Sequence, residues 1–112
     1  MPVLARRIED AGIPTVVVTM MPLTATQLLA PRTVGVEFPF GHPFGLPGDR
    51  ALQRRVLATA LTVLAGAAGA GARVDVDVEW PQARSEAYRA WQPPEPSPIV
   101  AQLLARRTDG AP

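Results

Sequence analysis

The sequence contains no cysteine, and lysine is absent too, so that all 11 basic residues are arginine. Without a thiol, the chain cannot form a disulfide, bind a metal through thiolates or use a cysteine nucleophile of its own. We attribute the exclusive use of arginine to the base composition of the genome rather than to function.

A strong net charge is also missing, because 11 basic and 10 acidic residues leave a net charge of +1. No basic face emerges beyond local arginine pairs, so the sequence gives no electrostatic case for nucleic-acid binding. Hydrophobic residues make up 47% of the 112 residues. That content favours one ordered domain over a disordered chain.

Long apolar runs are absent as well. The first ten residues carry charge where a signal peptide needs an apolar segment. The uncharged stretch at residues 57–72 is shorter than the ~20 residues of a membrane helix and is diluted by Gly, Ala and Thr. We therefore expect a cytoplasmic protein that does not bind membranes.

The apolar residues that are present predict alternating helices and strands. Helices are expected to start near Pro2, Pro22 and Asp49, and strands to span residues 13–20 and 33–38. Residues 13–20 are apolar on both faces, which is typical of a strand in the centre of a covered sheet. A right-handed crossover makes the first two strands parallel. The sequence thus predicts a small three-layer α/β domain with a mainly parallel sheet.

A third strand is predicted at residues 73–80, where valine alternates with charged residues. This strand should be half-buried and near an edge, with Asp75, Asp77 and Glu79 in solvent. Carboxylates that share a face of a strand lie ~7 Å apart, too far for one compact ion, so we expect no metal site. The long helix that precedes the strand carries Arg50, Arg54 and Arg55 near its start, which fits either an anionic partner or a solvated face.

The last part of the chain differs from the rest. We expect residues 1–80 to form the α/β core domain and residues 81–112 to form a C-terminal extension. The extension should hold a short helix, a polyproline arm at residues 92–98 and an amphipathic helix that Ser97 caps. The sequence leaves open whether this extension packs on its own core or on a partner.

The segment at residues 35–49 holds all three phenylalanines and the only histidine. Its back end alternates proline with glycine, which gives a shaped loop rather than a flexible one. In open α/β sheets ligands bind beyond the carboxyl ends of the strands, where this loop should lie. Glu37 and His42 fit either an acid/base pair or a structural hydrogen bond. Alternatively, the rings simply plug the end of the core and His42 is solvated.

Three segments carry a resemblance to a known family. Residues 5–19, with the turn Ala11-Gly12-Ile13-Pro14, resemble the helix, turn and strand of the glycine/sarcosine/betaine/D-proline reductase B-component (selenoprotein B) family. Residues 30–34 are similar to its A-x-R-x-V segment, and residues 39–47 to its P-x-G-x-P-x-G-x-P segment. The resemblance covers about the first two-thirds of the chain.

The resemblance implies reductive C–N cleavage by a complex of several subunits. In that family a selenocysteine or cysteine attacks the α-carbon of a substrate that another subunit's pyruvoyl group activates. This chain has no cysteine, so we expect a component of a reductase-like complex whose redox nucleophile lies on another chain, with no catalysis by a thiol or selenol of its own. The alternative is a non-catalytic binding or scaffolding domain derived from that family.

The expected site combines the loop with the ends of both strands. The expected partner is a protein subunit that carries cysteine or selenocysteine, and a small amine or amino acid is a further candidate ligand. We expect no cofactor, since a nucleotide-binding G-x-G-x-x-G turn is missing after the first strand. Glu37 and His42 are the candidates for catalysis. The residues expected to bind a ligand or partner are Thr19, Met20, Arg32, Glu37, Phe38, Phe40, His42 and Phe44.

Overall fold

The computed structural model describes residues 1–66 and 69–109, and it shows an α/β fold. Residues 110–112 of the expected extension lie outside the described residues. The described elements follow the order α1 (Pro2–Asp10), β1 (Val17–Thr19), α2 (Pro22–Gln27), β2 (Arg32–Gly35), α3 (Arg50–Gly66), β3 (Ala72–Asp75), α4 (Arg84–Trp91) and α5 (Pro98–Asp109).

The three strands form a parallel sheet in the order β1-β2-β3. The apolar run at residues 13–20 therefore contributes an edge strand, and the prediction that it lies in the centre is wrong. The central strand is β2, in which Val34 is fully buried. Each crossover helix moves the chain to the next position in one direction, so the second strand, not the most apolar one, has two neighbours.

Strand β1 is also shorter than the apolar run predicts. The strand begins at Val17, and before it the backbone N–H of Thr15 donates to the carboxylate of Glu9 on α1. At the other end the ladder runs slightly past the strands, because the N–H of Val36 donates to the carbonyl of Thr19 at 3.0 Å. The sheet therefore has a short regular part and an irregular carboxyl edge.

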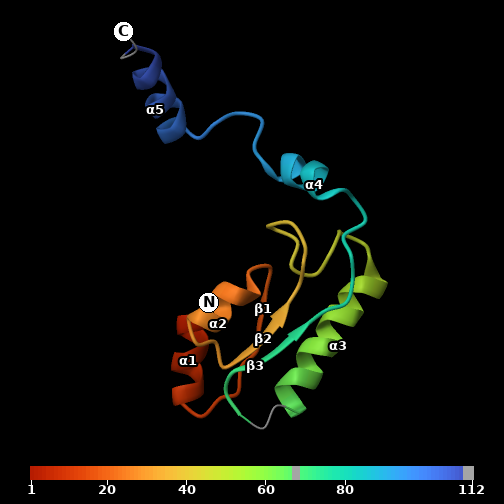
Figure 1. Cartoon of the computed structure of the whole chain (residues 1–112). Coiled ribbons are helices and arrows are strands. Elements are labelled where there is room, and N and C mark those ends of the chain that lie inside the picture. Colours follow the sequence, from red (N-terminus) through yellow and green to blue (C-terminus); the bar gives the residue numbers. More distant parts are fainter. Residues whose placement is uncertain (67–68, 110–112) are drawn as a thin grey trace.

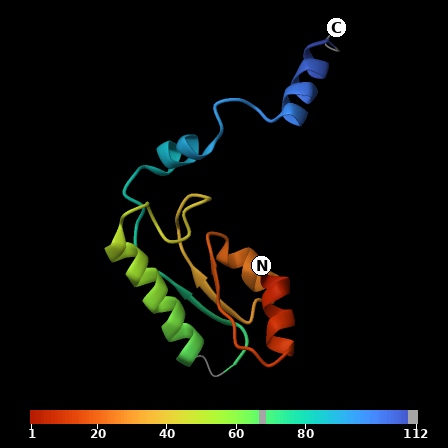
Figure 2. The same ribbon diagram turned by 180° about the vertical axis from the view of Figure 1, so that it is seen from behind.

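The sheet is covered on both faces, as the three-layer prediction requires. Helices α1 and α2 lie on one face and α3 on the other (Figure 1; Figure 2). Val17 packs with alanines of the first two helices, whereas Val34 packs with Ala60 and Val63 of α3. Because successive strand residues point to opposite faces, both layers form around the same three strands.

Helix α3 begins as the sequence predicts. The carboxylate of Asp49 accepts a hydrogen bond from the N–H of Leu52 at 3.0 Å, which satisfies one of the free donors of the first turn. An apolar stripe of α3 is buried at Val56, Ala60 and Val63. This stripe fixes which face of α3 lies on the sheet and leaves its arginine-bearing face in solvent.

Strand β3 is the exposed edge that was expected, although it ends at Asp75 instead of continuing to residue 80. Asp75, Asp77 and Glu79 are exposed, which confirms their predicted position. Val74 is exposed too, so the apolar face is less covered than its pattern indicates. One further bond to β2 follows Asp75, because the N–H of Val76 donates to the carbonyl of Gly35 at 2.8 Å, and the N–H of Val78 then donates to the carbonyl of Val76 within its own segment.

The two C-terminal helices differ in their contact with the core. Helix α4 packs on the core through Ala87, which is 5% exposed. Helix α5 projects away from the rest of the chain (Figure 1), and all of its residues whose burial is described are exposed. The radius of gyration is 18.2 Å, against about 13 Å for a compact domain of similar length. Within the described residues, no helix combines the length and the apolar content that crossing a bilayer requires.

Candidate functional site

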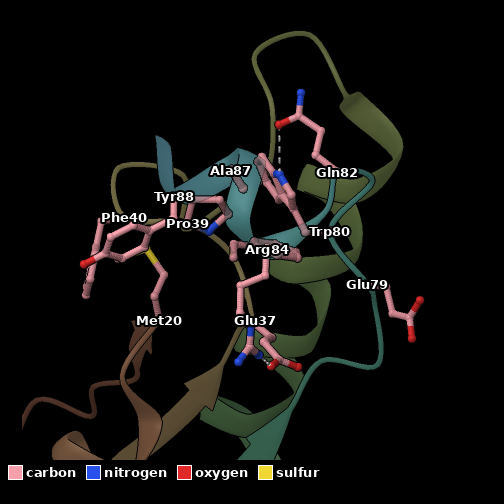
Figure 3. A pocket seen from close by; sticks show the side chains of 11 residues that line it. Met20, Glu37, Pro39, Phe40, Glu79, Trp80, Gln82, Arg84, Ala87 and Tyr88 are labelled. Carbon is pink, nitrogen blue, oxygen red and sulfur yellow. Dashed lines mark hydrogen bonds and ion pairs between the residues drawn. The ribbon is translucent and has the colours of Figure 1, made fainter. Parts of the chain in front are cut away.

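A pocket of about 520 Å³ lies at the carboxyl edge of the sheet (Figure 3). The segments that leave all three strands meet here, because parallel strands end at the same edge. Helix α4 closes the pocket from the side opposite the sheet. The lining residues are Met20, Glu37, Phe38, Pro39, Phe40, Glu79, Trp80, Gln82, Arg84, Ala87 and Tyr88.

Aromatic rings form the floor of the pocket. Phe38, which follows β2, is 6% exposed, and its ring centroid lies 5.3 Å from that of Trp80 at an interplanar angle of 52°. The indole N–H of Trp80 donates to the side-chain oxygen of Gln82 at 3.5 Å. The tilted ring pair joins the segments that follow β2 and β3, so the floor is built by the sheet edge itself.

The charged rim of the pocket joins two distant parts of the chain. The guanidinium of Arg84 on α4 donates to the carboxylate of Glu37 beyond β2, 47 residues away. Both side chains are mostly exposed, at 84% for Arg84 and 77% for Glu37, so solvent screens their attraction. The pair orients α4 over the pocket more than it stabilises the fold.

His42 does not join Glu37. Its ring packs on Trp80, with the centroids 5.5 Å apart at an interplanar angle of 40°. Because the Glu37 carboxylate pairs with Arg84, the structure does not assemble the expected acid/base pair, and each member of that pair has a different partner.

The other expected site residues lie in four different places. Met20 and Phe40 line the pocket, as expected of residues beyond the strand ends. Phe44 lies in a separate hollow against α3. Thr19 ends β1, where its hydroxyl accepts the N–H of Met21 at 3.0 Å. Arg32 begins β2 and is not brought to the pocket.

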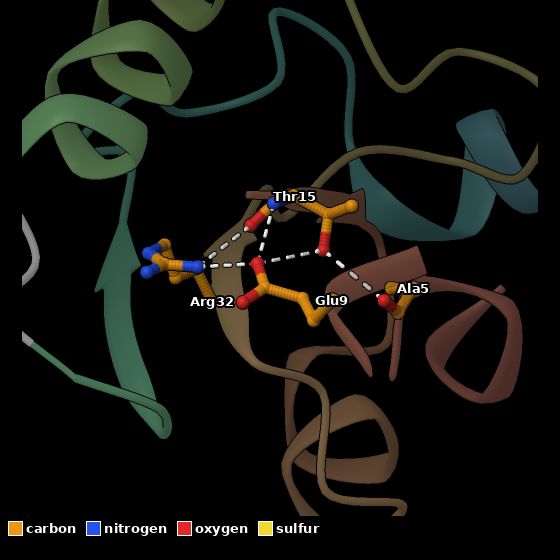
Figure 4. A network of polar contacts seen from close by, with 4 residues as sticks. All are labelled: Ala5, Glu9, Thr15 and Arg32. Atoms are coloured by element: carbon orange, nitrogen blue, oxygen red, sulfur yellow. Dashed lines mark hydrogen bonds and ion pairs between the residues drawn. The ribbon is translucent and has the colours of Figure 1, made fainter. Parts of the chain in front are cut away.

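Arg32 belongs to a polar network at the amino end of the strands (Figure 4). The carboxylate of Glu9 accepts hydrogen bonds from the guanidinium of Arg32 and from the backbone N–H of Thr15, both at 2.5 Å. The Thr15 backbone bond, supported by the Thr15 hydroxyl and by Arg32, lowers the pKa of Glu9 from its ordinary value of 4.5 despite opposing desolvation. The network ties α1 to β2 and is structural.

Sequence reasoning missed the part of the pocket that the C-terminal extension supplies. Arg84, Ala87 and Tyr88 all come from α4. No local sequence pattern predicts that they belong to the site, because they meet pocket residues that lie more than 40 positions earlier in the chain. The sequence pattern does single out Trp80, because this residue ends the apolar face of the third predicted strand. That pattern, however, predicts only that Trp80 lies in the core.

The arrangement fits binding better than catalysis. Apolar rings with carboxylates and one guanidinium at the rim suit an amphipathic ligand or a segment of another protein. The described residues bring together no group of three or more histidine or acidic side chains that could hold a metal ion. The pocket lining contains no thiol, hydroxyl-bearing serine or lysine that could act as a nucleophile.

Comparison with known proteins finds a similarity to one subunit of a reductase. The chain is 30% identical over 78 residues to D-proline reductase subunit gamma of Acetoanaerobium sticklandii. The aligned part covers 70% of this chain but only 32% of that subunit, so the chain spans about a third of the relative's length. No protein-family model matches the sequence, and no solved structure matches it significantly.

Proposed function

We propose that this chain is a component of a multi-subunit reductase-like complex in which another chain supplies the redox nucleophile. The observation that carries the proposal is the similarity to D-proline reductase subunit gamma, which extends over 70% of this chain. Residues 5–19, 30–34 and 39–47 also resemble the selenoprotein B family at the level of its turn and loop motifs. The sheet edge and the pocket give such a component a surface at which to work.

The chemistry explains why a second chain is needed. Reductive opening of D-proline breaks the bond between the α-carbon and nitrogen, and two electrons and two protons convert the ring to 5-aminopentanoate. A soft nucleophile attacks the α-carbon while the amine leaves with a proton, and a dithiol that becomes a disulfide supplies the electrons. Met1, Met20 and Met21 are thioethers and cannot provide a thiolate.

This chain would contribute the binding surface. Met20, Phe38 and Phe40 supply apolar contact, and Glu37 supplies a carboxylate that suits an amine or a basic side chain of the partner. Prolines at positions 39, 43 and 47 fix the loop, which lowers the entropy lost when it meets a partner. His42 lies beside Trp80 and extends the same surface.

A non-catalytic binding or scaffolding role is the second candidate. One observation favours it, namely that the polar groups of the site have structural partners: Glu37 pairs with Arg84, and His42 packs on Trp80. In this case the chain would hold a partner through the same surface without shaping its chemistry.

The deciding experiment isolates the tagged chain from its native organism under reducing conditions and assays the purified complex with D-proline and dithiothreitol. We expect no turnover by the chain alone and formation of 5-aminopentanoate by the complex, abolished when iodoacetamide alkylates the partner. A thiol-bearing complex that forms without turnover favours the scaffolding role. Turnover by the cysteine-free chain alone would contradict the proposal.

Variants test whether the sheet edge is the surface involved. Glu37→Gln should leave the melting temperature nearly unchanged, because an exposed ion pair contributes about 0–1 kcal/mol. We expect the same of His42→Ala, because the His42 side chain is only half-buried. Both should weaken binding of the isolated partner at least tenfold in a calorimetric titration. Arg107→Gln, at an exposed position of α5, serves as the matched control. If both variants bind as the wild type does, the loop is only a connector.

A further inference from the structure

A second hollow, of about 350 Å³, lies on the outer face of α3, away from the pocket. Phe44 and Leu57 give it apolar walls and are 38% and 49% exposed. Leu61, one helical turn beyond Leu57, is 54% exposed and continues the apolar surface along the helix. We call Phe44, Leu57 and Leu61 the α3 groove.

Two arginines stand at the start of this groove. Arg50 and Arg54 lie one turn apart in the hollow's lining, where like charges repel each other and also oppose the positive end of the helix dipole. The first turn of α3 holds no acidic residue, and neither arginine forms an ion pair within the part of the chain that is described. A carboxylate placed here would relieve both repulsions.

The C-terminal segment carries the complementary features in the same order. Glu95 is exposed in the proline-rich arm. After it, α5 bears an uncovered apolar stripe of Ile99, Val100, Leu103 and Leu104, all between 45% and 72% exposed. Glu95 precedes the apolar stripe of α5, just as Arg50 and Arg54 precede Leu57 and Leu61 on α3. The order of an acid followed by an apolar stripe is thus complementary to that of two bases followed by an apolar groove.

We infer that α5 of a second copy of this chain docks along the α3 groove, parallel to α3. Glu95 of that copy then faces Arg50 and Arg54, and its apolar stripe covers Phe44, Leu57 and Leu61. Helix i, i+4 rows of this kind pack in the usual manner of ridges and grooves. This inference concerns a different surface from the pocket and does not depend on the proposed function.

The path of the arm favours a second copy over the chain's own α3. The arm has prolines at positions 93, 94, 96 and 98, which favour an extended polyproline conformation that reverses direction poorly. In both overall views, α5 and α3 lie at opposite sides of the molecule (Figure 1; Figure 2). The longest dimension is 61 Å. If each copy docks its α5 on the other copy, the contact forms twice and closes a two-fold dimer. The doubled contact brings the buried surface area closer to the ~1,000 Å² of a specific interface.

Sedimentation equilibrium of the full chain from ~1 to ~500 µM tests the inference, and circular dichroism of each variant confirms that it folds. We expect a dimer that Leu103→Asp converts to a monomer. Glu95→Arg and Arg54→Glu should each raise the dimer dissociation constant at least tenfold, and the double variant should restore it to within threefold of wild type. Arg55→Glu, next to Arg54 but outside the hollow's lining, is the matched control and should change it little.

Three outcomes would overturn the inference. A chain that stays monomeric at ~500 µM has no such dimer. A dimer whose dissociation constant Leu103→Asp leaves unchanged uses another surface. A monomer whose radius of gyration by X-ray scattering falls from 18.2 Å toward the ~13 Å of a compact domain packs α5 on its own core.

Discussion

At the scale of single residues, Glu9 connects helix α1 to the sheet. Its carboxylate accepts from the backbone and hydroxyl of Thr15 and from the guanidinium of Arg32. The three partners come from the first loop and the central strand, so one side chain anchors α1 to the sheet. The hydrogen bonds favour the charged form of the carboxyl, which is why the pKa of Glu9 is lowered.

Glu9→Gln should therefore destabilise the protein in a pH-dependent way. A lowered folded-state pKa stabilises the fold above the ordinary value of 4.5, and this contribution disappears as pH falls through the folded-state pKa. We expect a lower melting temperature for the variant at pH 7 and a difference from wild type that shrinks below pH 4.5. Thermal melts of both proteins from pH 3 to pH 7 measure it. Asp10→Asn, an exposed neighbour, is the control, and a difference that grows in acid would contradict the prediction.

Phe38 and Phe40 should differ in how much each contributes to the stability of the fold. Phe38 is 6% exposed and packs on Trp80, whereas Phe40 is 38% exposed at the pocket. Phe38→Ala should lower the free energy of unfolding by ~3–5 kcal/mol, as a large cavity does, and Phe40→Ala should cost clearly less. Urea denaturation of the two variants decides the question. Equal losses would show that both rings are core.

Among the elements, the end of strand β2 is closely packed. Gly35 lies between β3 on one side and the first residue of α2 on the other. A Cβ atom at Gly35 would lie 2.8 Å from the Cβ of Pro22 and would collide with the carboxylate of Asp75. Glycine at this position lets the start of α2 approach the sheet edge, and it thereby positions the chain that leads into the pocket.

Gly35→Ala should thus destabilise the sheet. We expect a loss of ~1–3 kcal/mol in the free energy of unfolding, typical of an overpacked site, because Pro22 is rigid and cannot yield. Gly66→Ala is the matched control, since a Cβ there meets open space at the end of α3 and should cost nothing. Chemical denaturation of both variants measures the difference. Similar midpoints for the two would mean that the backbone at Gly35 has room to shift.

At the scale of the whole molecule, the chain is a small covered sheet with an outstretched C-terminal segment. Helix α4 completes the pocket through Ala87, Arg84 and Tyr88, while α5 contributes no buried side chain among its described residues. The two helices of the extension therefore differ. Helix α4 helps to form the pocket, whereas the exposed helix α5 can contact another surface. Whether residue 80 is the true domain boundary stays a prediction.

Removing α5 should leave the core intact. A chain that ends at Gln92 keeps every residue that is buried in the described part of the structure, so its melting temperature at ~1 µM should match that of the full chain, while its radius of gyration should fall toward ~13 Å. Differential scanning fluorimetry and X-ray scattering give the two values. A drop of several degrees would show that α5 packs on the core in solution.

The sequence by itself determined the local features of this protein. Its patterns predict the helices that start at Pro2 and Pro22, the Asp49 cap, the parallel α/β layers and the exposed acids beside β3, because each depends on neighbours within a few residues. The absence of cysteine excludes thiol chemistry in any fold. The loop that carries Phe38 and Phe40 was expected at the sheet edge, and both residues line the pocket there.

Only the tertiary structure decided which strand is central and what the site residues contact. The most apolar run became an edge strand, because position in the sheet follows from the crossovers and not from hydrophobicity. Glu37 meets Arg84 and His42 meets Trp80 through contacts between residues far apart in the chain. Local periodicity fixes the face on which a side chain lies, but the partner of that side chain depends on how separate elements pack.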